Sequence, residues 1–274
     1  MHSPVPKSSI IISVYDDCSA LRLILDSLVR QSTNEFEIIV SEDGASDKMK
    51  QCIDNHDKQA LKITHLSQED LGFRKNIALN RAIQVCDTEH IIFIDGDCVL
   101  HPEFVRSHQD YISPGIACTG RRVELGTTIS SGLREKKIDL NFLTNRINYL
   151  LHSKQLLADK TKNIESGIYS RVLHKLTADR DIRLLGCNFS CHRQDLIRIN
   201  GFNQDYLAPG IGEDSDIDWR LTMAGTTIKN VKFSAIQYHL HHPRIYESSN
   251  KNEAIFLKTQ KENIIICKNG IKNN

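Results

Sequence analysis

The sequence predicts an α/β fold in which a mostly parallel sheet carries helices on both of its faces. Short apolar runs rich in Ile and Val alternate with segments of helical spacing over the first hundred residues. That alternation is typical of βαβ units. The chain has 274 residues, 40% of them hydrophobic and 25% charged, which suits one large globular domain.

Four apolar runs predict buried strands, and the segments between them predict helices. The strands, with the turns that follow them, fall at residues 9–15, 36–47, 61–70 and 90–98. The helices fall at residues 18–32, 49–56 and 74–86. The first helix is the clearest, because Leu21, Ile24, Leu25 and Leu28 share one face.

Residues 127–181 differ in character and predict a helical insertion. The segment is polar and rich in Lys, Asn and Leu, and we interpret it as one or two surface helices with a linker. A solvated helical face accounts for its basic residues, and a contact with a membrane or an anionic acceptor stays open. Beyond it, three acids in the run from Gly212 to Asp216 precede a helix with Ile217 and Leu221 on its apolar side.

Composition limits the classes of partner and the compartment. The formal net charge of +1 favours neither nucleic acid nor a strongly acidic partner. The eight cysteines lack the paired CxxC spacing of a zinc site, so we expect buried free thiols. The first residues do not resemble a signal peptide, and no run approaches the ~20 apolar residues of a membrane span. We therefore expect a cytoplasmic protein, with a peripheral contact at the inner face of the membrane left open.

Acidic residues gather where the predicted strands end. They are Asp16 and Asp17 after the first strand, Glu42 and Asp43 after the second, and Asp95 and Asp97 after the fourth. In open α/β sheets, ligands bind beyond the carboxyl ends of the strands, so these side chains should share one crevice. A glycine-built phosphate site is not indicated, because no GxGxxG follows the first strand.

Asp95-Gly96-Asp97 has two interpretations. Asp-Gly is a common turn pair. Two carboxylates at the mouth of a buried strand, however, repel each other unless a cation compensates. Mg²⁺ or Mn²⁺ is held by one or two carboxylates together with substrate phosphates, which fits this pair.

Three histidines, His239, His241 and His242, fall at the end of a late predicted strand. In an extended chain His239 and His241 share a face and His242 points the other way. All three cannot reach one ion without a turn, and Pro243 favours a bend just after them. Histidine together with carboxylate suits Mn²⁺ better than Ca²⁺.

Taken together, these motifs resemble glycosyltransferase family 2, which has the GT-A fold. The resemblance rests on SIIISVY, SEDGASD and IIFIDGD, with Asn80 ahead of the Asp-x-Asp. The run GCNFSCHRQDLIRINGFN and the later GIGEDSDIDWRL resemble the galactosyltransferase-type segment of chondroitin polymerase domains and β-1,4-galactosyltransferases. Together, the two resemblances imply a nucleotide-sugar-binding half at residues 1–126, a helical insertion at residues 127–185, and an acceptor-binding and catalytic half at residues 186–274.

The resemblance implies a donor site for a UDP-sugar. Asp43 matches the acid that binds the uracil, with Val14 and Tyr15 near the base. Asp95 matches the acid near the ribose and the metal, and we include Gly96 beside it.

The resemblance also assigns a metal site and a catalytic base. Asp97 and His242 match ligands of Mn²⁺ (or Mg²⁺), and His239 sits where a second histidine ligand occurs in galactosyltransferases. Arg74 is expected to meet the ribose or the diphosphate.

Asp214 matches the base that takes the proton of the attacking hydroxyl, with Glu213 beside it on the acceptor. The implied activity is inverting transfer of a sugar, galactose or N-acetylgalactosamine favoured, from a UDP-sugar to a glycan or lipid-linked oligosaccharide in surface polysaccharide synthesis. Two alternatives stay open: a nucleotide-sugar-binding protein without turnover, and a metal-dependent nucleotidyltransferase or hydrolase.

Overall fold

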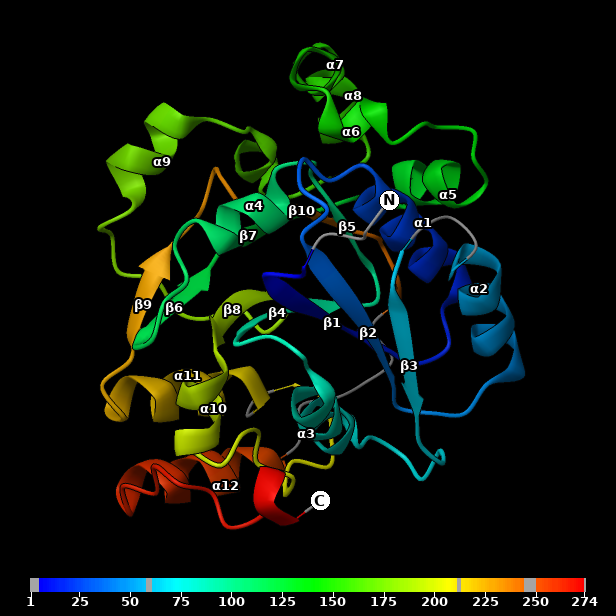
Figure 1. The fold of residues 1–274 in the computed structure, drawn as a ribbon. Coiled ribbons are helices and arrows are strands. Elements are labelled where there is room, and N and C mark those ends of the chain that lie inside the picture. Colours follow the sequence, from blue (N-terminus) through cyan, green and yellow to red (C-terminus); the bar gives the residue numbers. More distant parts are fainter. Residues whose placement is uncertain (1–4, 58–60, 211–212, 244–249, 274) are drawn as a thin grey trace.

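The computed structural model describes residues 5–57, 61–210, 213–243 and 250–273, and its centre is a seven-stranded sheet (Figure 1). The strands lie in the order β3-β2-β1-β4-β8-β6-β9. They are β1 (Ser8–Val14), β2 (Phe36–Glu42), β3 (Ile63–Ser67), β4 (His90–Asp95), β6 (Ile116–Thr119), β8 (Asn188–His192) and β9 (Thr227–Asn230). The first four are mutually parallel, and only β8 runs against its two neighbours. The predicted mostly parallel sheet is confirmed.

Alternation along the strands explains why helices cover both faces of this sheet. In β1, Ile10 and Ile12 enter one apolar cluster and Ile11 enters another, because successive side chains of a strand point to opposite faces. The first cluster includes residues of α1 (Cys18–Val29), α2 (Asp47–Asp57) and α4 (Phe104–Gln109). The second includes residues of α3 (Lys75–Val85), α10 (Arg193–Arg198) and α11 (Glu213–Met223).

A smaller three-stranded sheet lies beside the main one. Its strands are β5 (Cys98–Leu100), β10 (Ile236–His239) and β7 (Arg121–Glu124), in that order. The middle strand pairs antiparallel with β5 and parallel with β7. This sheet joins the chain just after the Asp95-Gly96-Asp97 turn to the late histidines.

The segment expected as one or two helices contains five short α-helices and a 3-10 turn. They are α5 (Thr127–Arg134), α6 (Asn141–Thr144), α7 (Arg146–Leu151), α8 (Ser153–Ala158), η1 (Ile164–Gly167) and α9 (Arg171–Thr177). Left-handed backbone at Lys136, Lys160 and Asn163 interrupts the helical runs. These helices are also more than a surface layer, since Leu133, Tyr149 and others pack on the small sheet. The proposed division at 127 and 185 stays a prediction.

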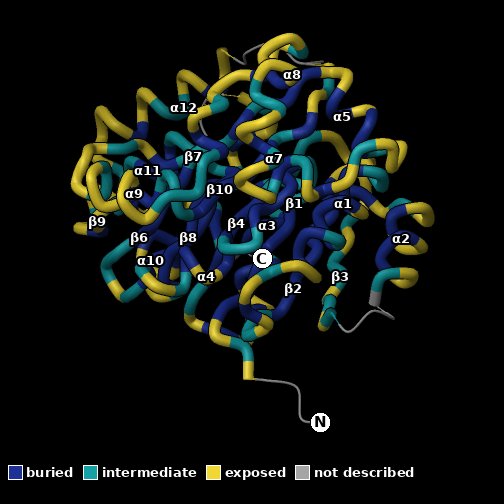
Figure 2. The backbone as a smooth tube through the Cα atoms, turned by 90° about the horizontal axis from the view of Figure 1, so that it is seen from above, coloured by how far each residue is buried: buried dark blue, intermediate teal, exposed yellow. Residues whose placement is uncertain are grey.

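The chain ends in α12 (Asn250–Lys261) and η2 (Ile271–Asn273), on the side of α10 and α11 (Figure 1). Figure 2 shows buried backbone in the central strands and exposed residues mainly in the outer helices and loops. All eight cysteines are free, and seven of them are buried, as expected. Along the described ranges, no helix combines the length and the apolar character needed to cross a bilayer.

Candidate active site

The carboxyl ends of β1, β2 and β4 open onto a cavity of about 840 Å³. Val14 and Tyr15 line it at the end of β1, Gly96 lines it after β4, and the first turn of α3 contributes Lys75. Six carboxylates share this cavity: Asp16, Asp17, Asp43, Asp70, Asp95 and Asp97. The acids that follow separate strands in the sequence therefore do converge, with Glu42 as the exception.

Glu42 is buried and serves the loop after β2. Its carboxylate accepts hydrogen bonds from the backbone N–H of Ser46, at 2.8 Å, and lies 2.7 Å from the ring nitrogen of His65. These contacts hold the turn that carries the next residue, Asp43.

Asp43 lies in the cavity wall with only 7% of its surface exposed. The side-chain amide of Gln68 donates to one carboxylate oxygen at 2.7 Å, and the backbone N–H of Arg74 donates to the other at 2.6 Å. The carboxylate is therefore held in one orientation and keeps lone pairs for a further donor.

Gly96 allows the Asp-x-Asp turn to lie directly on β1. Its N–H donates to the carbonyl of Ser13 at 2.7 Å. A Cβ atom at Gly96 would come within 2.8 Å of that carbonyl oxygen and of Val14. Only glycine fits here. The close approach of this turn to the end of β1 therefore accounts for a glycine at position 96, with or without a bound ligand.

Within the described residues, one group of three metal-ligating side chains converges. A carboxylate oxygen of Asp97 lies 3.1 Å from Nε2 of His239 and 3.2 Å from Nε2 of His242. One ligand atom from each residue fits within a 4.8 Å spread. Burial alone would raise the pKa of Asp97, but hydrogen bonds from the two imidazoles hold it well below its usual range. The same contact with Asp97 raises the pKa of His242.

Strand pairing and one turn bring these three side chains together. His239 ends β10 opposite Cys98, the residue after Asp97. The N–H of Leu240 then donates to the carbonyl of Asp97 at 2.8 Å. The chain turns beyond the strand, so that His242 reaches the same carboxylate. His241 is exposed, and its backbone N–H donates to Ser130 at 2.8 Å.

Basic side chains neutralise only some of the acids that line the large cavity. Arg134 neutralises Asp17 at 2.6 Å, and Lys75 neutralises Asp95 at 2.9 Å. Burial tends to raise the pKa of Asp17, but hydrogen bonds from Ser19, Ala20 and Arg134 lower it. The other acids leave an anionic wall, which would repel an anionic ligand. The oxygen and two nitrogens of the triad are donors that Mn²⁺ accepts, so the residues present fit such an ion.

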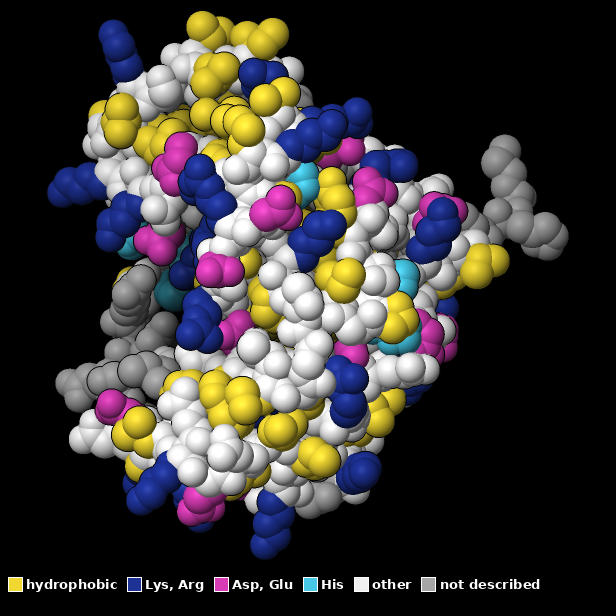
Figure 3. Space-filling view, turned by 90° about the vertical axis from the view of Figure 1, so that its left-hand side faces the viewer, with side chains coloured by type: hydrophobic (Ala, Val, Ile, Leu, Met, Phe, Trp, Pro, Cys, Tyr) yellow, Lys and Arg dark blue, Asp and Glu magenta, His cyan; other side chains and the backbone are white. Residues whose placement is uncertain are grey.

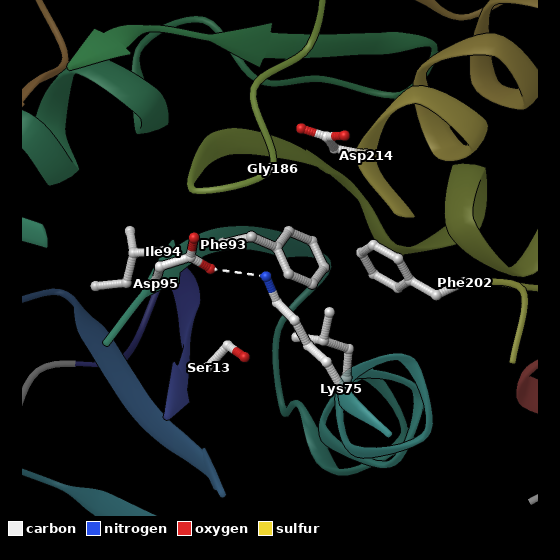
Figure 4. Close-up of a pocket in the computed structure, with 9 residues that line it drawn as sticks. Ser13, Lys75, Phe93, Ile94, Asp95, Gly186, Phe202 and Asp214 are labelled. Atoms are coloured by element: carbon white, nitrogen blue, oxygen red, sulfur yellow. Dashed lines mark hydrogen bonds and ion pairs between the residues drawn. The ribbon is translucent and has the colours of Figure 1, made fainter. Parts of the chain in front are cut away.

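Asp214 lies in the first turn of α11 and lines a second, small cavity (Figure 4). This cavity shares Ser13, Lys75 and Asp95 with the larger one. In Figure 4, Lys75 reaches Asp95, while Asp214 lies across the cavity beside Gly186. A Cβ atom at Gly186 would come within 3.0 Å of the Asp214 Cβ, so glycine makes room for it. The side chain of Glu213 lies outside the described residues.

Sequence reasoning missed Lys75 and named its neighbour Arg74. The Arg74 guanidinium donates to the backbone carbonyl of Glu69, and Lys75 is the residue of this pair that lines the cavity. It also missed Asp70, which accepts a hydrogen bond from the Tyr15 hydroxyl at 2.9 Å. A lysine in the first turn of a helix carries no mark of its function in the sequence. Only the fold brings Lys75 to Asp95.

Two family models match consecutive parts of the chain. Residues 9–168 match the model of glycosyl transferase family 2, and residues 169–243 match a family described as the N-terminal domain of galactosyltransferase. The chain is 26% identical over 234 residues to validoxylamine A glucosyltransferase of Streptomyces hygroscopicus subsp. jinggangensis (strain 5008), covering 81% of this chain and 53% of the relative. It is 23% identical over 186 residues to chondroitin synthase of Escherichia coli, covering 66% of this chain and 26% of the relative. The chain thus spans at most about half the length of these relatives.

Solved structures with the same fold carry nucleotides and manganese. GalNAc-T7 with UDP, GalNAc and Mn²⁺ has a TM-score of 0.61 at 12% identity, covering 95% of this chain and 48% of that one. A mannosyltransferase of Pyrobaculum calidifontis in complex with GDP-Man and Mn²⁺ has a TM-score of 0.57 at 16% identity, covering 88% and 59%. At these identities the likeness establishes the fold. With the family match over more than half of the chain, the protein belongs to glycosyltransferase family 2, and it has the GT-A fold.

Proposed function

We propose that this chain transfers a sugar from a UDP-sugar to a hydroxyl of a glycan, with inversion and with a divalent cation. The observation that carries the proposal is the convergence of Asp97, His239 and His242 at the large acidic cavity. Family membership favours a transferase over the two alternatives, a binding protein without turnover and a metal-dependent hydrolase or nucleotidyltransferase.

The donor nucleotide lies along the ends of β1 and β2 in this proposal. Asp43 accepts the uracil N3–H, and its two hydrogen bonds from the protein keep the acceptor oriented. Val14 and Tyr15 pack against the base, and Asp95 faces the ribose. Lys75, which pairs with Asp95, supplies positive charge on the same side of the cavity.

Asp97, His239 and His242 would hold Mn²⁺ or Mg²⁺. When bound, the ion supplies Lewis-acid stabilisation of the charge that develops on the leaving diphosphate. The protein's own contribution is the fixed spacing of the three ligands, which the β5–β10 pairing maintains. The role of Arg74 toward the ribose or the diphosphate stays a prediction.

Asp214 is the proposed base. Inversion by a single displacement needs one group on the acceptor side that takes the proton of the attacking hydroxyl. Asp214 lines the small cavity that adjoins the donor cavity, and one of its oxygens accepts the N–H of Ser215 at 2.8 Å. Glu213, the residue before it, is proposed to contact the acceptor.

The second family match bears on the choice of sugar. The galactosyltransferase-type match at residues 169–243 favours galactose or N-acetylgalactosamine. The names of relatives and of solved structures include glucosyl, mannosyl and N-acetylgalactosaminyl chemistry. A glycan or lipid-linked oligosaccharide in surface polysaccharide synthesis is the proposed acceptor.

A screen of UDP release tests the function. The full chain is incubated with Mn²⁺ and each of several UDP-sugars, with and without candidate glycan acceptors. We expect release of UDP that depends strongly on acceptor, is largest with UDP-galactose or UDP-N-acetylgalactosamine, and stops with chelator. Release at the same rate without any acceptor would instead describe a hydrolase.

A further inference from the structure

The short helices α7 and α8 present an apolar face to solvent. Ile147, Leu150, Leu151 and Leu157 are 68%, 46%, 73% and 65% exposed. The first three are spaced at i, i+3 and i+4, so they lie on one side of α7. An exposed face of several large aliphatic residues is unusual on a monomeric protein and marks an interaction site.

The opposite side of the same helices is fixed to the protein. Tyr149 and Leu156 are buried in the cluster beneath the small sheet. The Tyr149 hydroxyl donates to the carbonyl of Ile164 at 2.8 Å. Because these anchors occupy the inner face, Ile147 and Leu151 cannot turn inward without giving up the buried contacts.

Helix α9 repeats the pattern nearby. Val172 and Leu176 are 68% and 67% exposed and lie four residues apart on one side, while His174 between them is buried. In Figure 1, α7 and α8 lie at the top of the molecule and α9 lies at its upper left. Figure 3 looks at that left-hand side and shows hydrophobic side chains gathered over its upper part, with Lys and Arg around them.

The charge around these helices is strongly positive. Residues 141–180 hold seven Lys and Arg against three Asp and Glu, whereas the whole chain has a net charge of only +1. Two of the three acids are engaged: Asp159 accepts backbone N–H groups of Thr128 and Ile129, and Glu165 pairs with Lys232.

Basic residues of these helices and of the turn after α8, in contrast, face solvent. Lys154, Lys160 and Lys175 are exposed, and no acid among the described residues pairs with them. Their charges are free to meet an anionic partner.

We propose that the outer face of α7, α8 and α9 docks onto an anionic lipid bilayer. We call this face, made of the exposed apolar and basic side chains named above, the α7–α9 surface. Aliphatic side chains beside unpaired lysines suit the boundary between acyl chains and anionic headgroups, where apolar burial and charge attraction act together. Lysine stems can also lie along the apolar surface while their amines reach the headgroups.

The charge of the α7–α9 surface also favours a bilayer over a second copy of this chain as its partner. In a symmetric dimer the same patch meets itself, so the α7–α9 surface would bring two sets of unpaired lysines together. Like charges oppose that contact, whereas phosphate headgroups favour the bilayer. The inference is independent of the donor, the metal and the base, because docking requires none of them.

Vesicle flotation with the full chain tests the proposal. The probes are vesicles of phosphatidylcholine alone and vesicles that also contain phosphatidylglycerol. We expect the parent to bind the phosphatidylglycerol vesicles, and added salt to weaken that binding. The double variant Ile147→Asn/Leu151→Asn should bind them roughly tenfold or more weakly, since it removes two large apolar contacts. Lys154→Gln and Lys175→Gln should each weaken binding roughly fivefold.

The matched control is Leu257→Asn on α12, where Leu257 is 57% exposed on a helix far from α7 (Figure 1). It should bind like the parent. All four substituted side chains of the α7–α9 surface are exposed, so unchanged melting temperatures show that each variant is folded. The proposal fails if the parent does not float with the phosphatidylglycerol vesicles, or if the double variant floats as the parent does. It also fails if light scattering shows that the parent is a dimer and the double variant a monomer, because the α7–α9 surface would then join two copies of the chain.

Discussion

Replacing Asp214 by Asn separates its proposed chemical role from a structural one. Asp214 lies in the first turn of α11, where a carboxylate also favours the helix dipole. Its oxygen accepts the Ser215 N–H at 2.8 Å, and the amide oxygen of Asn can accept the same bond. Asn also has the size of Asp, so it fits the space beside Gly186. The substitution therefore removes the ability to take a proton and leaves the local contacts in place.

The expected effect on rate is large, and the effect on stability is small. Loss of a general base lowers the rate by roughly 10²–10⁴, or about 3–5 kcal/mol in activation free energy. Loss of the charge at the helix start costs about 0.3–1 kcal/mol of stability. The assay measures acceptor-dependent UDP release, together with the melting temperature and the calorimetric affinity for UDP-sugar with Mn²⁺. We expect near-parent melting and binding, with almost no transfer.

Asp216 in the same helix gives the contrasting control. Its carboxylate is buried and bonds Nε of the buried Arg220 at 2.7 Å. Asp216→Asn leaves a buried charge without its counter-ion, which costs about 3 kcal/mol or more of stability. Transfer by Asp214→Asn within a few-fold of the parent would refute the assignment of the base, and Glu213 would be tested next.

Three further predictions concern the other parts of the site and the core. His242→Ala should weaken Mn²⁺ binding, measured by calorimetry, by roughly tenfold or more. His241→Ala changes an exposed side chain outside the triad and should leave Mn²⁺ binding unchanged. A larger loss of Mn²⁺ affinity in His241→Ala than in His242→Ala would contradict the choice of ligands. Asp43→Ala should raise the dissociation constant of UDP roughly tenfold or more, because a hydrogen bond to a charged group is worth ~1.5–3 kcal/mol, and equal affinity of the parent for UDP and CDP would count against this contact. Burial lowers the pKa of His108 to about 4. Between about pH 6.5 and pH 4 the imidazole is therefore protonated in the unfolded chain and neutral in the folded chain. The free energy of unfolding should fall by up to ~3 kcal/mol as the pH drops through this range. In urea titrations across that range His108→Gln should flatten this fall, and an unchanged slope would show that other groups cause it.

The sheet could be predicted because its signals are local. Strands β1, β2 and β4 each contain a run of apolar, mostly β-branched residues, and such a run specifies a buried strand without knowledge of its partners. The sequence also predicted that the acids at the strand ends converge, because the carboxyl ends of parallel strands meet at the same edge of the sheet. Glu42 departed from that expectation because alternation along β2 turns it inward, while Asp43, the next residue, faces the cavity.

Contacts between distant segments could not be predicted in the same way. Arg134 reaches Asp17 from 117 residues away in the chain, and Lys75 reaches Asp95 across 20 residues. Neither pair has a pattern that the sequence displays. Some of the breaks within residues 127–181 likewise fall at single residues with left-handed backbone, such as Lys136 after α5, whose conformation no residue preference indicates.

The dependence of UDP binding on metal tests the central claim most directly. UDP is titrated by calorimetry into the parent and into Asp97→Asn, each with Mn²⁺ and with chelator. Since the cavity wall is anionic, we predict that Mn²⁺ tightens UDP binding to the parent by roughly tenfold or more, and that Asp97→Asn loses this gain while it still unfolds in one cooperative thermal transition, at a lower temperature because its contacts with His239 and His242 are weakened. An equal affinity of the parent for UDP with Mn²⁺ and with chelator, or an undiminished gain in Asp97→Asn, would contradict the account.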